Sequence, residues 1–298
     1  MLFLRLIDYL THFNIEHYFD YKTADLVSFK IGGNARLVIF PRYEKELVEI
    51  LLLIKNNKFV ILGKGTNCYF NSDYYDGIVV STIKLSKIRV EKTNLICQCG
   101  ASIASACKIA RENSLSGLEF AYGIPGSIGG AVYINASAYG REFSSIIEET
   151  RALDLNSGEI VYLNNFEHKF GLKHSIFKDR ALIILETKLS LHSAHLKDIS
   201  DKMRHYLTKR KKSQPLNLPN AGSTFIKPNG HYASQLIDEC GLKGLTIGGA
   251  QVSTKHAGFL VNIGNATSND VLKIIKQIKK EIYAKYGVNL VEEIIYIE

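Results

Sequence analysis

An uncharged, glycine-rich stretch at residues 123–140, Gly-Ile-Pro-Gly-Ser-Ile-Gly-Gly-Ala-Val-Tyr-Ile-Asn-Ala-Ser-Ala-Tyr-Gly, sets the strongest limit on how this chain folds. A surface linker would carry charge, and a core helix would lose roughly 0.5–1 kcal/mol at each glycine relative to alanine. The stretch therefore predicts a buried turn whose backbone N–H groups approach a ligand, and an anionic, flat cofactor suits such groups. A tight turn between two core strands is the alternative.

A second stretch of the same kind follows an apolar strand, in the sequence Phe-Val-Ile-Leu-Gly-Lys-Gly-Thr-Asn at residues 59–67. It lacks the spacing of a P-loop, Gly-x4-Gly-Lys-[Ser/Thr]. The dinucleotide fingerprint Gly-x-Gly-x-x-Gly is also missing. The two stretches together indicate a nucleotide site that belongs to neither of these common folds.

Composition places the chain among globular proteins with two or three lobes, since 46% of its 298 residues are hydrophobic and 22% are charged. Arg5 and Asp8 interrupt the apolar opening segment, which a signal peptide would keep free of charge. The longest apolar run near the N-terminus is far shorter than the roughly 20 residues of a membrane span. We therefore expect a cytoplasmic protein with no membrane partner.

The net charge of +8 is densest at residues 209–212, Lys-Arg-Lys-Lys. Such a run is commonly a solvated helix end, and it would also steer polyanionic small molecules. No aromatic platform accompanies it, so we expect no nucleic acid partner.

The chain has five cysteines, Cys68, Cys97, Cys99, Cys107 and Cys240. Cys97 and Cys99 are two residues apart, which puts both on one face of a strand. No further ligands for a standard zinc site are nearby, so we expect five reduced thiols and no metal.

The order and type of the predicted elements change along the chain, and we expect three lobes, at residues 1–80, 81–193 and 194–298. The first has helices at 2–16 and 43–56, a strand–turn–strand at 28–41 and a strand at 59–62. The second has strands at 78–81, 88–91, 95–99, 152–155, 160–163 and 181–189, with a helix at 103–111. The third has helices at 194–212 and 233–239, strands at 258–261 and 290–297, and a long helix between Thr267 and Gly287.

Several motifs occur in a fixed order along nearly the whole chain. They are Ser-Phe-Lys-Ile-Gly-Gly-Asn-Ala (28–35), Leu-Gly-Lys-Gly-Thr-Asn (62–67), Gly-Leu-Glu-Phe-Ala-Tyr-Gly-Ile-Pro-Gly-Ser-Ile-Gly-Gly (117–130), Asn-Ala-Ser-Ala-Tyr-Gly (135–140), Asn-Ala-Gly-Ser-Thr-Phe (220–225), Gly-Leu-Lys-Gly (241–244) and Gln-Val-Ser-Thr-Lys-His-Ala-Gly-Phe-Leu-Val-Asn (251–262). In these motifs the chain resembles the UDP-N-acetylenolpyruvoylglucosamine reductase family of flavoenzymes, in its shorter type.

The resemblance implies an α+β fold of three lobes. Two lobes would form an FAD-binding domain like that of the vanillyl-alcohol-oxidase-like flavoproteins, and the C-terminal lobe would bind the nucleotide sugar. FAD would be held non-covalently, and NADPH would be the co-substrate. The matching cofactor-binding residues are Gly63, Lys64, Gly65, Thr66, Asn67, Gly123, Pro125, Ser127, Ile128, Gly129, Gly130, Asn135, Ala138 and Gly140.

The implied reaction is the reduction of the enolpyruvyl group to give UDP-N-acetylmuramate, a precursor of peptidoglycan. NADPH would reduce FAD, and hydride would then reach C3 of the substrate while C2 is protonated. Ser223 matches the family's proton donor, and Glu293 matches the glutamate that binds the substrate carboxylate. Taken alone, Ser223 reads as a cap of the turn after Gly222. Glu292, on the other face of the same strand, is the rival of Glu293, and we expect it to be solvated.

One catalytic position departs from the family. The family pattern Phe-x-Tyr-Arg-x-Ser-x-Phe has Leu172 and Lys173 here in place of tyrosine and arginine. Lysine keeps the positive charge but loses the two parallel N–H donors of arginine. One hypothesis is that Lys173 acts with weaker stabilisation of the enolate, and a second is that His174 or another cation compensates.

The resemblance also suggests substrate contacts in the third lobe. Lys227, Lys243 and His256 are candidates for the UDP phosphates, and Gln251 and Asn262 for the sugar and base. We expect a monomer or weak dimer that acts on small molecules. The alternatives are a flavin-dependent oxidase of the same superfamily acting on another sugar, and a non-catalytic binder of nucleotide sugars or nucleic acid.

Overall fold

The computed structural model describes residues 2–71 and 73–298, which form two compact units. The first unit comprises Met1–Phe19, Leu37–Lys64 and Gly77–Thr208, and the second comprises Asp20–Arg36, Gly65–Asp76 and Lys209–Glu298. No helix in the described residues is both long and apolar enough to cross a membrane.

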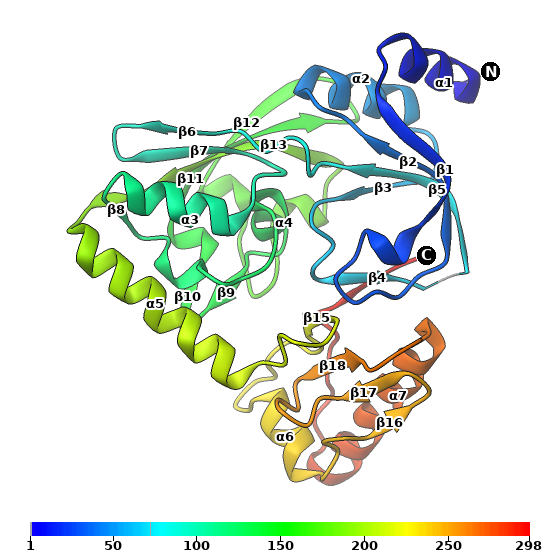
Figure 1. Cartoon of the computed structure of the whole chain (residues 1–298), viewed down its shortest axis with the longest axis vertical. Helices are drawn as coiled ribbons and strands as arrows, with labels where there is room; N and C mark the ends of the chain where they lie inside the picture. Colours follow the sequence, from blue (N-terminus) through cyan, green and yellow to red (C-terminus); the bar gives the residue numbers. More distant parts are fainter. Residues whose placement is uncertain (1, 72) are drawn as a thin grey trace. The chain divides into compact units, whose positions relative to one another are not determined.

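The first unit is built on a five-stranded antiparallel sheet in the order β12-β11-β13-β7-β6. Its strands are β6 (Ile88–Glu91), β7 (Asn94–Gln98), β11 (Ile147–Asp154), β12 (Ile160–Asn164) and β13 (Leu182–Ser190). The helices α3 (Ile103–Glu112) and α4 (Ile128–Tyr133) pack against β7, and α4 also contacts β13 (Figure 1). The prediction of a mainly β core with one helix near residue 103 is confirmed for this sheet.

The N-terminal part of the first unit contains α1 (Leu2–His12), α2 (Glu44–Ile54) and β3 (Phe59–Leu62), which runs parallel to β5 (Tyr74–Ser81). The sheet order here is β1-β2-β5-β3, with β1 at Glu16–Lys22 and β2 at Asn34–Phe40. The division into two units cuts β1, β2 and β5. One face of α2 buries leucine and isoleucine side chains in the same hydrophobic core as α3.

Short elements complete the first unit. They are β8 (Leu115–Ser116), β9 (Ser137–Ala138), β10 (Arg141–Glu142) and β14 (His192–Ser193). The long helix α5 (Leu196–Ser213) follows, and its last turn belongs to the second unit. β9 and β10 form a two-residue hairpin with Tyr139 and Gly140 at its tip. Both tip residues have positive φ, 55° and 77°, as a tight hairpin turn of this kind requires.

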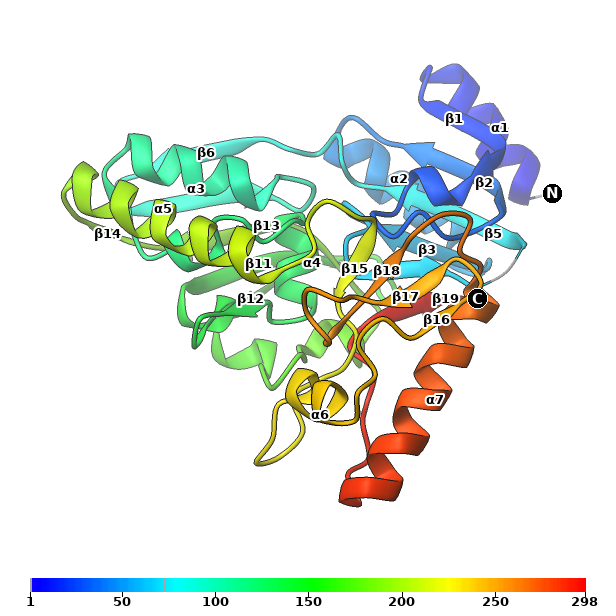
Figure 2. The same ribbon diagram turned by 60° about the horizontal axis from the view of Figure 1, so that its bottom comes forward.

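The second unit has an antiparallel sheet in the order β15-β18-β17-β16, with α6 and α7 packed into its core. The bounds are β15 (Asn220–Ser223), α6 (Ala233–Glu239), β16 (Thr246–Ile247), β17 (Ala250–Val252), β18 (Phe259–Asn262) and α7 (Ser268–Tyr286). The helix α7 contacts β16 and β17. Figure 2 shows this helix from the side. A separate parallel pair joins β4 (Cys68–Phe70) to β19 (Ile295–Ile297).

The predicted limits of the long helix are confirmed. The Thr267 hydroxyl accepts a hydrogen bond from the Asp270 amide at 3.2 Å, and the Asp270 carboxylate accepts one from the Thr267 amide at 2.9 Å. This reciprocal capping box starts α7, and Gly287 ends it with φ at 67°.

Three sequence predictions are wrong in detail. The first helix ends at His12 rather than residue 16, because Asn14 adopts a left-handed conformation and the Ile15 amide returns to the Leu10 carbonyl. Ser28 starts no strand, since its amide bonds to Gly65 and its hydroxyl to Asn220. The last strand is confined to β19, because Val291 and Glu293 hydrogen-bond instead to the 224–226 segment.

The expectation that the glycine-rich stretch excludes a helix is also wrong, because Gly129 and Gly130 lie in α4. A Cβ atom at Gly129 would come within 2.9 Å of the Cys99 side chain. The glycine lets this short helix pack directly on the strand segment, and that contact offsets its low helix propensity. The turn prediction holds before the helix, where Gly123 and Gly126 have φ values of 105° and 154°.

Candidate functional site

A pocket of about 340 Å³ lies in the first unit, and we call it the first pocket. One part of its wall is apolar, from β3, β13 and the loop before β13, and another is small and polar, from Gly63 and the start of α4. The lining residues are Phe59, Val60, Ile61, Gly63, Thr82, Cys99, Ser127, Gly129, Gly130, Tyr133, Phe177, Arg180, Leu182, Ile183 and Ile184.

Backbone atoms lie unusually close together where the two predicted glycine-rich stretches meet in the first pocket. A Cβ atom at Gly63 would lie 2.2 Å from the Ser127 hydroxyl oxygen, so no side chain fits there without a shift. Ser127 is buried, and its hydroxyl accepts a hydrogen bond from the Gly130 amide at 3.3 Å. The Gly129 amide donates to the Cys99 carbonyl at 2.8 Å. Gly63 thus packs tightly against the start of α4, whose residues Ser127, Gly129 and Gly130 we call the glycine–serine cradle.

The other predicted cofactor residues are distributed over both units. Lys64 is exposed, and Gly65 and Asn67 belong to the second unit, where the Asn67 amide donates to the Glu293 carbonyl at 3.1 Å. The rest are Thr66 in the second unit and Gly123, Pro125, Ile128, Asn135, Ala138 and Gly140 in the first. Ile128 is fully buried, and Ala138 and Gly140 belong to the β9–β10 hairpin. Their contacts with a cofactor stay predictions.

Several lining residues of the first pocket were missed by the sequence analysis. Phe177 and Tyr133 stand inside motifs that we quoted, but neither was assigned a site role. Thr82, Cys99 and Arg180 carry no local signal of a ligand site. Burial raises the pKa of the Cys99 thiol to about 12, which keeps this side chain a neutral thiol near neutral pH. All five cysteines are free thiols, as predicted.

Lys173 projects from a tight turn in the first unit. Gly171 and His174 exchange two backbone hydrogen bonds, of 3.1 and 3.2 Å, and Lys173 adopts a left-handed conformation with φ at 55°. Its ammonium donates to the Ser137 hydroxyl at 3.1 Å. His174, the cation that we considered as a substitute, forms an exposed pair with Asp179 at 3.1 Å.

Ser223 and Glu293 lie on neighbouring segments of the second unit. Ser223 ends β15, directly after Gly222, whose φ of 80° favours glycine. The Glu293 amide donates to the Thr224 carbonyl at 2.8 Å. Segments 70 residues apart in sequence are therefore adjacent at this point, as a shared site requires.

Glu292, the rival of Glu293, forms an ion pair with a neighbouring helix. Glu292 accepts hydrogen bonds from the Lys279 ammonium of α7 at 3.0 and 3.1 Å, with 28% of its side chain exposed. An ion pair with a neighbouring helix is a structural task for Glu292, and the assignment of Glu293 to the substrate carboxylate stays a prediction.

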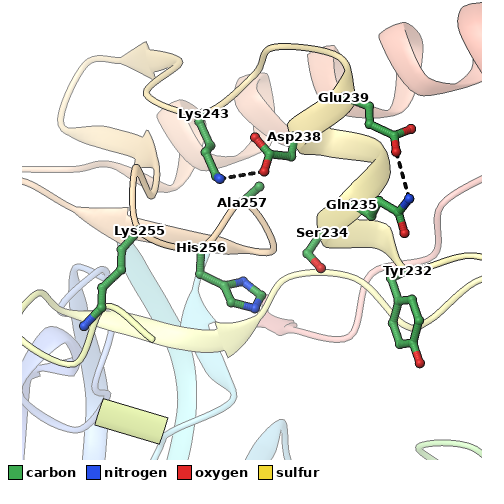
Figure 3. A pocket seen from close by; sticks show the side chains of 9 residues that line it. All are labelled: Tyr232, Ser234, Gln235, Asp238, Glu239, Lys243, Lys255, His256 and Ala257. Atoms are coloured by element: carbon green, nitrogen blue, oxygen red, sulfur yellow. Dashed lines mark hydrogen bonds and ion pairs between the residues drawn. The ribbon is translucent and has the colours of Figure 1, made fainter. Parts of the chain in front are cut away.

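A second pocket, of about 550 Å³, lies in the second unit between α6 and the loop that precedes β18 (Figure 3). Its lining residues are Tyr232, Ser234, Gln235, Asp238, Glu239, Lys243, Lys255, His256 and Ala257. Lys243 pairs with Asp238 at 2.6 Å. Burial, together with the charge of Lys243, lowers the pKa of His256. The Gly258 amide donates to Nδ1 of His256 at 3.2 Å, so the neutral ring carries its proton on Nε2.

The second pocket brings together Lys243 and His256 of the five predicted substrate residues. Lys227 instead stacks its ammonium 4.3 Å from the ring centre of Tyr232, and Gln251 donates to the Thr246 hydroxyl. Asn262 is buried, and its side chain donates to the Phe29 carbonyl and accepts from the Ala266 amide. Tyr232, Ser234 and Lys255 are lining residues that the sequence analysis missed.

A buried histidine sits beside the Lys173 turn. His168 stacks on Phe170 with ring centres 4.8 Å apart, and its Nδ1 lies 2.7 Å from the Asn164 carbonyl. Its Nε2 has no hydrogen-bond partner within residues 2–71 and 73–298. Burial lowers the pKa of His168 below its ordinary value of 6.5.

This lowered pKa predicts a pH-dependent stability. The native His168 is neutral, whereas the unfolded side chain binds a proton below pH 6.5, so acid favours unfolding. We expect the free energy of unfolding to fall as the pH drops below 6.5, with a slope of at most about 1.4 kcal/mol per pH unit from this residue. Urea unfolding between pH 5 and 8 measures it. His168→Phe should be less stable but should show a shallower slope, and an unchanged slope would refute the assignment to His168.

Two family models match the chain. An FAD-binding domain matches residues 35–164, which include Gly63 and the glycine–serine cradle. A UDP-N-acetylenolpyruvoylglucosamine reductase C-terminal domain matches residues 214–297, which include Ser223, Glu293 and the second pocket. The fold is thus α+β, with an FAD-binding domain followed by a C-terminal substrate domain, and the protein is an FAD-containing oxidoreductase.

Relatives that match 90% or more of this chain narrow this class to one family. UDP-N-acetylenolpyruvoylglucosamine reductase of Caldanaerobacter subterraneus subsp. tengcongensis is 43% identical over 269 residues, 90% of this chain and 89% of the relative. That of Caldicellulosiruptor bescii is 38% identical over 97% of this chain and 93% of the relative. This chain belongs to the UDP-N-acetylenolpyruvoylglucosamine reductase family.

Solved structures agree with this assignment. The crystal structure of UDP-N-acetylenolpyruvylglucosamine reductase from Thermus caldophilus matches with a TM-score of 0.81 and 26% identity, covering 95% of this chain and 99% of that one. A berberine bridge enzyme variant matches with a TM-score of 0.50 and 14% identity, over 64% of this chain and 44% of that one, which shows a likeness of fold alone.

Proposed function

We propose that this protein catalyses the NADPH- and FAD-dependent reduction of UDP-N-acetylenolpyruvoylglucosamine to UDP-N-acetylmuramate, for peptidoglycan precursor synthesis. The observation that carries the proposal is the 43% identity to a reductase of this name over 90% of the chain. A sugar oxidase or a non-catalytic binder would not account for a C-terminal domain of the reductase type, with Ser223 in it.

The first pocket suits FAD. Its wall at Gly63 and the glycine–serine cradle is made of small residues, and its apolar wall suits an aromatic ring. We assign Gly63, Ser127, Gly129 and Gly130 to holding the cofactor. When bound, FAD supplies the hydride-transfer chemistry that no protein side chain offers.

Lys173 and Glu293 would bind the carboxylate of the enolpyruvyl group. When a hydride adds to C3, negative charge develops on that carboxylate as the C2–C3 double bond opens. A positive charge at Lys173 stabilises this change, and a hydrogen bond from a protonated Glu293 would assist it. Both residues therefore act on the charge that forms in the transition state.

Ser223 would complete the reduction by giving its hydroxyl proton to C2. The substrate then has gained a hydride at C3 and a proton at C2, and Ser223 regains a proton from solvent. A serine hydroxyl is a weak acid, so this step needs groups near Ser223 that stabilise its anion.

The second pocket would bind the diphosphate of the nucleotide sugar through Lys243 and His256. Lys243 already pairs with Asp238, so that carboxylate competes with an anionic ligand. We expect Lys243→Ala to weaken UDP binding about tenfold and Asp238→Asn to strengthen it severalfold. Isothermal titration calorimetry of each holoenzyme with UDP measures both affinities. Lys276→Ala, which removes an equal charge from the exposed face of α7, is the control, and an equal loss there would exclude a specific role for Lys243.

The proposed reaction is tested by product analysis. Purified holoenzyme with NADPH and UDP-N-acetylenolpyruvoylglucosamine should consume one NADPH per substrate and yield a product heavier by two hydrogens. Consumption of NADPH without that product would mean that the acceptor is wrongly assigned.

A further inference from the structure

Lys173 has a flexible side chain, yet the structure holds its ammonium at a defined place. We infer that Ser137 is a positioning residue for Lys173, so that the site is built around a lysine and not around an arginine. This rests on the proposed role of Lys173 at the substrate carboxylate. The observation is the 3.1 Å hydrogen bond from the Lys173 ammonium to the Ser137 hydroxyl.

The turn that carries Lys173 is strained and is held from outside. A left-handed conformation is unfavourable for a non-glycine residue, and Lys173 has φ at 55°. Asn135 compensates at one end, since its buried amide donates to the Gly171 carbonyl at 3.0 Å. At the other end the buried Ser175 hydroxyl donates to the Tyr133 carbonyl at 2.7 Å. Residues 133–135 therefore fix both ends of the turn.

Asn135 is itself fixed, so it is a firm anchor. Its amide also donates to the Glu142 carboxylate at 2.8 Å, and its oxygen accepts from the Ser144 amide at 2.9 Å. With the bond to Gly171, both amide hydrogens and the oxygen are engaged. The backbone under Lys173 thus has little freedom.

Ser137 is equally well held. It lies on β9 and pairs with Glu142 of β10. At the tip of this hairpin, Tyr139 stacks on Tyr206 of α5 with ring centres 4.6 Å apart, and its hydroxyl donates to the Tyr206 carbonyl at 2.9 Å. The hydroxyl that meets Lys173 therefore comes from a clamped hairpin.

A serine is a suitable partner for a catalytic lysine. Ordering a free lysine side chain costs rotamer entropy, and a fixed acceptor brings about part of that ordering before the ligand binds. The acceptor is neutral, so it does not cancel the charge that the carboxylate needs. An ammonium has three N–H donors, so a bond to Ser137 is compatible with another to a carboxylate.

The test compares two ligands that differ by a lactyl ether group, which carries the carboxylate. UDP-N-acetylmuramate carries the lactyl carboxylate, and UDP-N-acetylglucosamine lacks it. Binding of each to the oxidised holoenzyme is measured by titration calorimetry for the wild type, Ser137→Ala, Ser137→Thr and Lys173→Met. We expect Ser137→Ala to lower the affinity for UDP-N-acetylmuramate about five- to tenfold, and to change the affinity for UDP-N-acetylglucosamine less than about twofold. Ser137→Thr should restore the affinity for UDP-N-acetylmuramate.

The double variant separates positioning from a general structural effect. In the Lys173→Met background, Ser137→Ala should have no further effect on either ligand. The inference would be overturned if Ser137→Ala lowered the affinity for both ligands equally. It would also be overturned if Ser137→Ala caused the same loss of affinity with and without Lys173. If Lys173→Met selectively weakens UDP-N-acetylmuramate but Ser137→Ala does not, the positioning role alone fails. If Lys173→Met has no selective effect, the proposed carboxylate role of Lys173 fails with it.

Discussion

Replacing Ser223 with alanine should lower kcat by about 10²–10⁴, the range typical for loss of a positioned proton donor. The KM for the nucleotide sugar should change little, because the hydroxyl acts on C2 in the transition state rather than in binding. Flavin reduction by NADPH should proceed at the wild-type rate, since protonation of C2 belongs to the other half of the reaction. Stopped-flow absorbance under anaerobic conditions measures the two halves separately.

Ser213→Ala is the matched control for this change. Ser213 is an exposed serine at the end of α5, and its hydroxyl donates to the Lys209 carbonyl at 3.0 Å. It should leave both half-reactions unchanged. A Ser223→Ala enzyme that keeps more than about a tenth of the wild-type kcat would contradict the assignment of the proton donor.

Replacing Gly63 with alanine should release FAD. The new Cβ atom would lie 2.2 Å from the hydroxyl oxygen of Ser127, a buried residue that caps α4. To relieve this clash, the end of β3 or the glycine–serine cradle must shift. Overpacking of this kind destabilises a protein by about 1–3 kcal/mol. We expect FAD to bind about 10- to 100-fold more weakly, as measured by flavin fluorescence during titration of the apoprotein.

The double variant Gly63→Ala/Ser127→Ala is the control for this explanation. Removing the hydroxyl relieves the closest contact, and the next atom, Ser127 Cβ, lies 3.3 Å from the new methyl group. The double variant should therefore bind FAD more tightly than Gly63→Ala alone. If it binds no better, the loss of FAD does not come from the Gly63–Ser127 contact.

Local signals in the sequence were sufficient for some elements. The start of α7 follows from Thr267 and Asp270 and its end from Gly287, and each of these residues lies within one turn of the helix end that it sets. The final strand was overextended because its partners are distant, at residues 68–70 and 224–226. The helix α4 was missed because glycine propensity opposes it, while the close contact of Gly129 with Cys99 is visible only in three dimensions.

The candidate site shows the same division. Composition marked the two glycine-rich turns as a ligand site, and the family resemblance assigned Gly63, Ser127, Gly129 and Gly130 to the cofactor. The structure brings these four residues into one pocket. Side chains such as Phe177 and Arg180 reach that pocket from ordinary-looking segments. The partnership of Lys173 with Ser137 joins residues 36 positions apart, and neither motif alone indicated it.

The most direct test of the reductase assignment is anaerobic stopped-flow of the purified holoprotein. The flavin is first reduced with NADPH, UDP-N-acetylenolpyruvoylglucosamine is then added, and the flavin absorbance is followed. We predict rapid reoxidation with UDP-N-acetylmuramate as the product, which would also show that Lys173 serves in place of the family arginine. Reduction by NADPH that the enolpyruvyl substrate fails to reverse would contradict the proposed function.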